Sequence, residues 1–191
     1  MAEEKIKGVP FAVALNTSPR QYGLTGFKVI RHNLDTTGGL MAPVDITANV
    51  DIDEFENTVP AYAGAPVVST KGFAKAERIG IHDADKEIHA GDIINLAGGM
   101  YAVLGVDLND SGDGTLDLAL PLRADVEAAT PIIRTGRTGN YRLTITESAA
   151  GSVQYRVTVS DAYPAIDITS QVLDIISGES GVVVDNSKLL L

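Results

Sequence analysis

The chain has 191 residues, 45% of them hydrophobic and 21% charged, which is an ordinary composition for a folded protein and excludes general disorder. It contains no cysteine, which excludes disulfides, thiolate nucleophiles and cysteine-bound zinc. The net charge is −10, and residues 81–130 hold ten acidic residues against two basic ones, so we do not expect specific nucleic-acid binding.

Strand-like segments dominate the first part of the chain. Residues 11–16 (FAVALN) and 27–33 (FKVIRHN) are short apolar or β-branched runs separated by a Ser/Pro/Gly turn, which predicts two strands. Residues 42–55 (APVDITANVDIDEF) alternate between apolar and polar residues, which is typical of one half-buried strand. Residues 56–72 carry two prolines among small residues and predict a long loop or an extended arm.

The middle of the chain has the most regular pattern. Residues 92–98 (DIINLAG) and 100–106 (MYAVLGV) predict two strands joined by a tight hairpin at Gly98-Gly99. Residues 115–122 (TLDLALPL) alternate again, and the strand should stop at Pro121, which cannot donate to a β-ladder. Residues 123–131 (RADVEAATP) suit a single helical turn before a strand at 131–136.

The final third predicts a further hairpin and an ambiguous segment. Residues 140–148 (NYRLTITES) and 153–161 (VQYRVTVSD) are two strands joined by AAGS. Residues 167–178 (DITSQVLDIISG) fit a helix capped by Asp167 and closed by Gly178, and they fit a strand about equally well. The tail at 181–191 (GVVVDNSKLLL) suggests a strand with an apolar end that needs cover from the core or from a neighbour.

These elements predict a mainly β fold of β-barrel or β-sandwich modules, with an extended arm and at most one or two short helices. A local duplication, RTGRTG at residues 134–139, is a plausible boundary. We therefore expect a β-rich domain at residues 1–135 and a small C-terminal β unit at residues 136–191.

The acidic run DLNDSGDGTLDL (residues 107–118) invites comparison with a calcium-binding loop. An EF-hand loop needs oxygen ligands at positions 1, 3 and 5, glycine at 6 and a bidentate glutamate at 12. Asp107, Asn109, Ser111 and Gly112 fit the early positions, but Leu118 occupies position 12 and the flanking segments predict strands. We predict a hairpin loop, with weak calcium binding by the Asp107–Asp117 loop as the alternative.

Two further groups of polar residues are candidate sites. The histidines are His32, His82 and His89, and the last two lie near an acidic group in a spacing that matches no recurrent metal motif; the group is Asp83, Asp85 and Glu87. A solvated acidic loop is the simpler interpretation. A second set of carboxylates should form a solvated strand face: Asp51, Asp53, Glu54 and Glu56.

Catalytic motifs are missing from the sequence. There is no G-x-S-x-G nucleophile elbow, no glycine-rich phosphate loop and no tryptophan for stacking on a sugar. We assign no catalytic, cofactor-binding or metal-binding residue and expect the chain not to be an enzyme. The N-terminus lacks a basic region followed by a long apolar run, and no apolar run approaches the roughly 20 residues that span a bilayer, so we expect neither a secretory signal nor a membrane partner.

One stretch of about 45 residues, from Ile88 to Ile132, has an ordered set of features: a Gly-Asp opening, an apolar strand, a Gly turn, a Tyr-bearing strand, an acidic Gly loop, a Thr-led strand and Pro-Leu-Arg. The matching positions are Gly91-Asp92, Ile93–Leu96, Gly98-Gly99, Tyr101–Val103, Asp107–Gly114, Thr115–Leu120 and Pro121–Arg123. This stretch resembles a small β module of tailed-bacteriophage virion proteins, particularly tail-associated ones. The resemblance implies a β-barrel-like module at about residues 81–135.

The resemblance also implies a function. It suggests a structural subunit of the virion, most readily a tail or neck (head–tail connection) component that assembles as a ring or tube in the host bacterial cytoplasm. The expected partners are further copies of the chain and other virion proteins. Two alternatives stay open: a capsid decoration (cement) protein, and a host-surface or carbohydrate-binding module.

Overall fold

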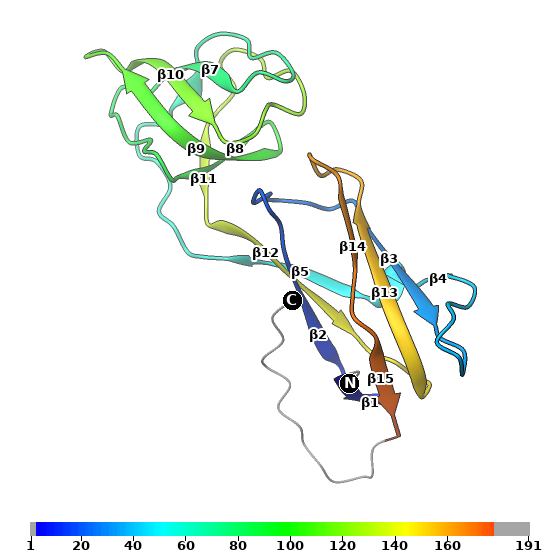
Figure 1. Ribbon diagram of the computed structural model, residues 1–191. Helices are drawn as coiled ribbons and strands as arrows, with labels where there is room; N and C mark the ends of the chain where they lie inside the picture. Colours follow the sequence, from blue (N-terminus) through cyan, green and yellow to red (C-terminus); the bar gives the residue numbers. More distant parts are fainter. Residues whose placement is uncertain (1–2, 178–191) are drawn as a thin grey trace. The chain divides into compact units, whose positions relative to one another are not determined.

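The computed structural model describes residues 3–177, which form fifteen strands and one short 3₁₀ helix (Figure 1). This confirms the expected mainly β fold. The chain divides into two compact units. In the described part, the first unit comprises residues 3–20, 24–55 and 139–177, and the second comprises residues 21–23 and 56–138. Each unit is considered by itself.

The first unit contains two sheets. The larger has the order β1 (Glu3–Ile6), β15 (Leu173–Ile176), β13 (Gly151–Val159), β3 (Phe27–Asn33) and β4 (Val44–Asp45), and β14 (Ile166–Thr169) also pairs with β13. The smaller has the order β2 (Phe11–Asn16), β12 (Arg137–Ile145) and β5 (Asp51–Glu56). β1 runs parallel to β15, whereas β2 with β12 and β3 with β13 are antiparallel.

Both sheets contribute to one core in this unit. Because side chains alternate between the faces of a strand, every second residue of β12 and β13 points inward. The buried side chains include Phe11 and Leu15 of β2, Val29 of β3, Tyr141, Leu143 and Ile145 of β12, and Val153, Tyr155, Val157 and Val159 of β13. Two sheets sharing an apolar interior form a β-sandwich.

Two strand predictions for this unit need correction. The strands at 140–148 and 153–161 exist, but they lie in different sheets and do not form a hairpin, because their apolar faces meet across the core. The alternating run at 42–55 is not one strand: β4 and β5 are separated by the 3₁₀ helix Thr47–Asn49. Asp45 accepts hydrogen bonds from the Thr47 backbone N–H (3.0 Å) and hydroxyl (2.7 Å), a local turn that competes with the β-ladder.

The helix predicted at 167–178 is wrong, and the strand alternative is confirmed for its described part. Residues 166–169 and 173–176 form β14 and β15, which pair along β13. The Ser170 backbone between them donates to the Tyr155 carbonyl at 2.8 Å, so the ladder continues through the junction. Pairing with a long central strand therefore overrides a helical pattern. The predicted cap Gly178 and the tail at 181–191 lie outside the described residues.

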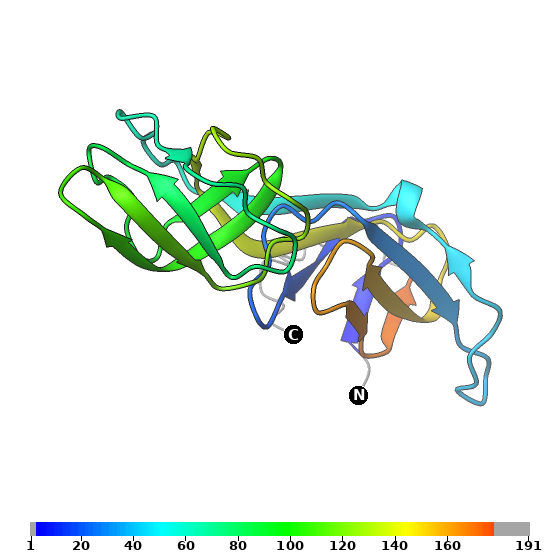
Figure 2. The ribbon, with the colours of Figure 1, turned by 90° about the horizontal axis from the view of Figure 1, so that it is seen from above.

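The second unit is one six-stranded sheet that curls on itself (Figure 2). Its order is β11 (Ile133–Thr135), β8 (Ile93–Leu96), β9 (Gly99–Leu108), β10 (Asp113–Leu118), β7 (Arg78–His82) and β6 (Val67–Val68). The Val68 N–H donates to Thr130 O, and the Ile132 N–H donates to Pro66 O, both at 2.9 Å, joining the two ends of the sheet. The closed sheet surrounds a core of Val68, Ile79, Ile81, Ile88, Ile94, Leu96, Tyr101, Val103, Leu116, Leu118, Leu122, Val126 and Ile132.

Local predictions for the second unit mostly agree with the structure. The β8–β9 hairpin is confirmed, although its two loop residues are Ala97 and Gly98, with φ of 51° and 89°, because Leu96 already pairs with Gly99. Of the loop or arm predicted at 56–72, residues 57–66 contain no strand, but Val67 and Val68 form β6 and pair with β7. The helical turn expected at 123–131 is wrong: Val126 and Gly72 exchange backbone hydrogen bonds at 2.8 Å instead.

The division of the chain differs from the boundary expected at residue 135. The chain passes from the second unit to the first between Thr138 and Gly139, close to the expected position. Most of residues 3–55, however, belong with the C-terminal strands, because β1, β2 and β3 pair with β15, β12 and β13. The module expected at about 81–135 lies within the second unit, which begins at residue 56 in its main segment.

Candidate functional site

The acidic run is the tip of the β9–β10 hairpin. Residues Asp107 and Leu108 pair with Thr115 and Gly114, and the loop lies between the paired strands, as the hairpin interpretation predicts. Inside the loop the Asn109 carboxamide oxygen accepts hydrogen bonds from the Ser111 N–H (2.9 Å), the Ser111 hydroxyl (2.7 Å) and the Asp113 N–H (3.0 Å). The Asn109 oxygen, which would be the calcium ligand at position 3, is therefore already used in hydrogen bonds that hold the turn.

The carboxylates around this tip are directed to basic side chains. Asp117 makes a two-point contact with Arg78 (2.6 and 3.0 Å), Asp113 lies 2.8 Å from His82 Nδ1, and Asp110 lies 3.7 Å from Lys86. The contact with Arg78 lowers the pKa of Asp117, and the hydrogen bond to His82 lowers the pKa of Asp113. Within residues 3–177, no group of three or more metal-binding side chains converges.

The second predicted group, around His82 and His89, is dispersed in the structure. Asp83 is fully buried and accepts a hydrogen bond from the Ile88 N–H at 2.8 Å. The prediction of a solvated acidic loop is therefore wrong for Asp83. Glu87 accepts the N–H groups of Ala63 (3.0 Å) and Gly64 (2.7 Å) in the arm. Both carboxylates therefore bind backbone N–H groups, and the buried Ile88 N–H in particular needs such an acceptor.

Asp92 is the centre of a buried network that sequence reasoning did not identify. Its carboxylate is 7% exposed and accepts hydrogen bonds from the Tyr62 hydroxyl (2.7 Å), the Arg134 guanidinium (2.6 Å) and the His89 N–H (3.0 Å). Burial raises the pKa of Asp92, but the three donors outweigh it and leave the pKa below its usual value. The sequence marked Asp92 only within a Gly-Asp pair, and the two side chains that bind it, Tyr62 and Arg134, lie 30 and 42 residues away.

The first unit has a comparable buried network around Glu147. This carboxylate is 4% exposed and accepts the Tyr155 hydroxyl at 2.7 Å and the Arg31 guanidinium at 2.7 Å. Burial, followed by the hydrogen bond to Glu147, raises the pKa of Tyr155. Glu147 lies in the connection between β12 and β13, so the network fixes that connection against β13 and β3. No sequence signal marked it, because Arg31 lies 116 residues from Glu147 in the chain.

The carboxylates expected on a solvated strand face lie on β5 and are mostly exposed, but they also make contacts. Asp53 lies 3.3 Å from Arg142, and Glu54, which is half-buried, accepts the Gly139 N–H at 2.9 Å. Asp51 and Glu56 are exposed. His32 lies on β3, where its Nδ1 is 3.4 Å from the Met41 carbonyl.

A loop of the first unit, residues 34–44, presents large apolar side chains to solvent. Leu40 is 60% exposed and Met41 is 52% exposed. Asp35 holds the loop, since its carboxylate accepts the N–H groups of Thr37 and Gly39 at 2.8 Å. Because the loop is ordered by hydrogen bonds while its apolar side chains stay outside, it is a candidate contact surface. The sequence alone did not identify this loop as a candidate.

The chain matches no protein-family model, no curated protein and no solved structure. Among residues 3–177, no helix has the length and apolar character needed to cross a membrane.

Proposed function

We propose that the chain is a structural subunit of a tailed-phage virion, most readily a tail or neck component that assembles as a ring or tube. The observation that carries the proposal is the apolar surface of the 34–44 loop, where Leu40 and Met41 are 60% and 52% exposed; Val44, which begins β4 at the end of the loop, is 43% exposed. Apolar groups held outward by a rigid loop lower the free energy of association when a partner covers them.

The resemblance at residues 88–132 supports this proposal independently of the loop. In the structure this stretch supplies β8, β9 and β10 and ends at Ile132, whose N–H bonds to Pro66 where the sheet closes. The residues that define the resemblance therefore belong to one closed barrel. Such a rigid module suits a component that must keep its shape inside a larger assembly.

The use of the buried ionisable groups is also consistent with a structural role. Asp92 binds Tyr62 and Arg134, and Glu147 binds Arg31 and Tyr155. Each network joins segments that are far apart in sequence. Buried hydrogen bonds between such distant segments favour one fixed arrangement of the backbone.

Light scattering after size-exclusion chromatography tests the proposal. We expect the purified chain to form an oligomer of defined mass, and Leu40→Asp with Met41→Asp to shift it toward the monomer without changing its circular dichroism. Leu104→Asp is the matched control, because Leu104 is 64% exposed on β9 of the second unit. A wild-type chain that stays monomeric, and is absent from labelled virions in micrographs, would contradict the proposal.

Two other outcomes would favour the alternatives. A trimer that binds empty capsids would favour a capsid decoration protein, and binding to host glycans would favour a host-surface or carbohydrate-binding module.

A further inference from the structure

The edge of β2 is open in the first unit. Among the described residues, β2 lies at the end of the smaller sheet and pairs only with β12, in the register Phe11 to Ile145 through Asn16 to Asn140. In an antiparallel ladder every second residue directs its N–H and C=O away from the partner strand. Within residues 3–177 these outward groups of β2 bond to no other strand or loop. An open edge of this kind can accept a further strand.

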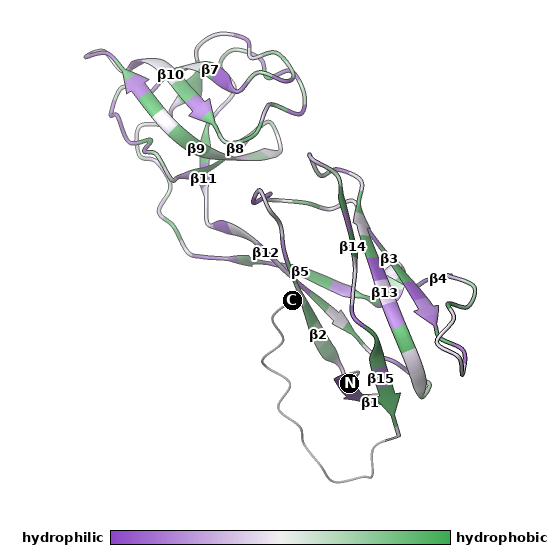
Figure 3. Ribbon diagram, viewed as in Figure 1, coloured by the Kyte–Doolittle hydropathy of each residue, from purple (hydrophilic) through white to green (hydrophobic). Residues whose placement is uncertain are grey.

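An apolar groove follows this open edge. One recess is lined by Phe11, Ala12 and Val13 on one side and by Ser170, Gln171 and Leu173 on the other. A second recess lies beside the first, since both are lined by Val13 and Ser170. Its other lining residues include Leu15, Leu143, Tyr155, Val157 and Ile168. Figure 3 shows both β2 and β15 as mainly hydrophobic.

The size of the groove fits side chains rather than a small-molecule ligand. Each recess encloses a cavity of about 20 Å³. That is room for roughly one water molecule or one methyl group, whereas ligand pockets are on the order of 300 Å³ or more. Shallow apolar recesses beside an open strand edge are what the alternate side chains of an added strand require.

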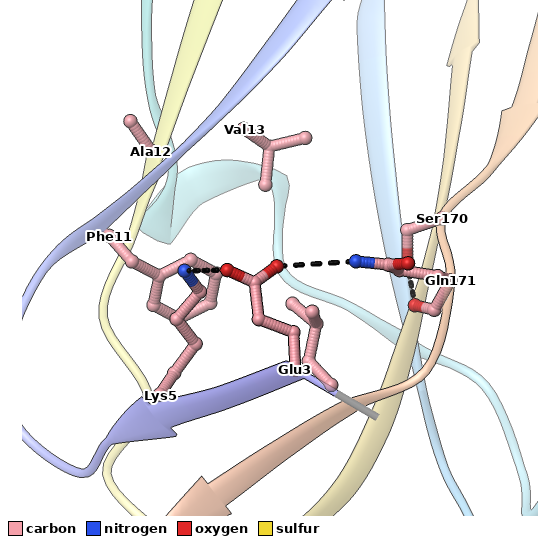
Figure 4. Close-up of a pocket in the computed structure, with 8 residues that line it drawn as sticks. Glu3, Lys5, Phe11, Ala12, Val13, Ser170 and Gln171 are labelled. Atoms are coloured by element: carbon pink, nitrogen blue, oxygen red, sulfur yellow. Dashed lines mark hydrogen bonds and ion pairs between the residues drawn. The ribbon is translucent and has the colours of Figure 1, made fainter. Parts of the chain in front are cut away.

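A buried lysine and a partly exposed glutamate lie at one end of the groove. Lys5 is 3% exposed, and its ammonium donates to Glu3 at 2.8 Å and lies 5.8 Å from the centre of the Phe11 ring. Figure 4 shows Glu3 between Lys5 and Gln171, whose side-chain amide donates to the second oxygen of Glu3 at 3.2 Å. Because these polar groups satisfy one another, an apolar strand can cover them without leaving an unpaired charge.

The chain contains a segment of suitable chemistry beyond the described residues. Fifteen residues follow Ile176, and the last eleven, GVVVDNSKLLL, hold three consecutive valines and three consecutive leucines. Consecutive apolar residues place apolar side chains on both faces of a strand. An eleven-residue strand is about 36 Å long, against about 20 Å for the six residues of β2. One groove on one unit therefore covers only part of this segment, and the rest needs a second surface.

The position of Ile176, next to the end of the described residues, favours a second copy as the source of the strand. Ile176 ends β15 beside Lys7, whose N–H donates to it at 2.8 Å, and the neighbouring Gly8 N–H bonds to Glu147, close to where Phe11 begins β2. A tail of the same copy would start near the Phe11 end of β2. If it paired with β2, it would therefore run parallel to it. A tail from another copy can run antiparallel, the pairing that is more stable per residue.

We propose that the β2 edge and its groove accept residues 181–191 of a second copy of the chain as an added antiparallel strand. This inference rests on the proposed self-assembly and names one of its contacts. The backbone of β2 provides affinity, and the recesses beside Val13 select small apolar side chains. Repeated from copy to copy, the contact links subunits head to tail, and it closes into a ring if the rotation between copies allows.

Disulfide trapping between two different copies tests the proposal, because the chain contains no cysteine of its own. A tagged chain carrying Val183→Cys is mixed with an untagged chain carrying Ala14→Cys, refolded together and oxidised. We expect a disulfide-linked pair of the two chains on a non-reducing gel, at least about fivefold more abundant than with the control, since a disulfide forms only between closely spaced Cα atoms. The control is Asp51→Cys on β5, the opposite edge of the same sheet.

A chain that carries both Ala14→Cys and Val183→Cys distinguishes the two sources of the strand. A link within one chain, with none between the mixed chains, would overturn the proposal and assign the groove to the chain's own tail. Equal linking to Asp51→Cys would overturn it as well, because the contact would then be unspecific.

A chain ending at residue 177 provides a second measurement. We expect it to keep its circular dichroism, to have a lower mass than the full chain in light scattering, and to bind a synthetic peptide of residues 181–191. A truncated chain that assembles like the full chain, with no link to Ala14→Cys, would overturn the inference while leaving the proposed function intact. A full chain that is monomeric and forms no link would count against both.

Discussion

The two units of this protein are built from very different parts of the chain. The second unit takes nearly all of its residues from one continuous segment, 56–138, and its strands β8, β9 and β10 pair with their neighbours in sequence. The first unit combines both ends: Glu3 pairs with Leu173, and Phe27 with Val159. The difference shows that a barrel made of consecutive hairpins can be recognised locally, whereas a sandwich closed by long-range pairs cannot.

Both units nevertheless hold distant segments together by the same arrangement. A buried carboxylate, Asp92 in the second unit and Glu147 in the first, accepts hydrogen bonds from an arginine and a tyrosine of other segments. Such a carboxylate stabilises the fold only while its partners remain, because a single buried unpaired charge is costly. The comparison therefore predicts that the second unit folds from one segment of the chain, whereas the first unit needs both ends. It also predicts that removing the buried carboxylate lowers the stability of either unit by a similar amount.

The largest expected effect comes from separating the segments. Expressed alone, residues 56–138 should fold and unfold cooperatively, while residues 136–191 alone should remain unfolded because β2, β3 and β5 are missing. For residues 136–191 the expected loss is the whole free energy of unfolding of a domain, on the order of 5–10 kcal/mol. Amide dispersion in NMR spectra and denaturation curves measure both fragments. Cooperative folding of residues 136–191 would remove the distinction between the two units.

Removing the carboxylate of the first unit should have the next largest effect. Glu147→Ala leaves the Arg31 guanidinium and the Tyr155 hydroxyl without their acceptor, and we expect a loss of about 3 kcal/mol in the free energy of unfolding. Asp167→Ala is the matched control, because its pair with Arg156 is half exposed and should contribute less than about 1 kcal/mol. Urea denaturation measures both variants, and equal effects would show that burial of the pair is unimportant.

The carboxylate of the second unit should make stability depend on pH. The pKa of Asp92 is lower in the folded chain than the roughly 3.9 of an unfolded chain, so its contribution is present above pH 4 and is lost as the pH falls through the lowered pKa. Asp92→Asn should cost about 2 kcal/mol at neutral pH and weaken the acid dependence. Denaturation from pH 7 to pH 2 measures both effects. The exposed Asp110→Asn serves as control, and an unchanged acid dependence in Asp92→Asn would contradict the assignment.

The smallest expected effect concerns the β8–β9 turn. Ala97 has φ of 51°, a left-handed conformation that asparagine adopts more readily than alanine. We expect Ala97→Asn to stabilise the second unit by about 0.5 kcal/mol and Gly98→Ala, at φ of 89°, to destabilise it by about 1 kcal/mol. Urea midpoints measure the two changes, and effects of the same sign would show that the turn conformation does not limit stability.

Sequence patterns predicted the second unit better than the first. The alternation in residues 92–122 and the glycine turn gave the right strands, because each partner lies within a few residues. In the first unit, the predicted hairpin of 140–148 with 153–161 separated into two sheets, and the helix predicted at 167–178 became β14 and β15. The hairpin was wrong because β12 and β13 pair with strands more than a hundred residues away, β2 and β3. The helix was wrong because pairing with the long strand β13 overrides the local helical pattern of 167–178.

The candidate sites show the same division. Position 12 of the acidic run and its strand-like flanks were enough to predict a hairpin tip at Asp107–Gly114. The partners of Asp117 and Asp113 on β7, and those of Asp92, were not predictable, because hydrogen-bond partners depend on which strands become neighbours.

By itself, the sequence determined the mainly β class, the turns of the central hairpins and the apolar face of most strands, since these follow from the two-residue period and from glycine conformations. The folded structure was needed to show which strands share a sheet, which carboxylates become buried and where a strand edge stays open. Those features depend on which distant segments pair most favourably, and that choice is made by the packing of the whole unit rather than by any local run of residues.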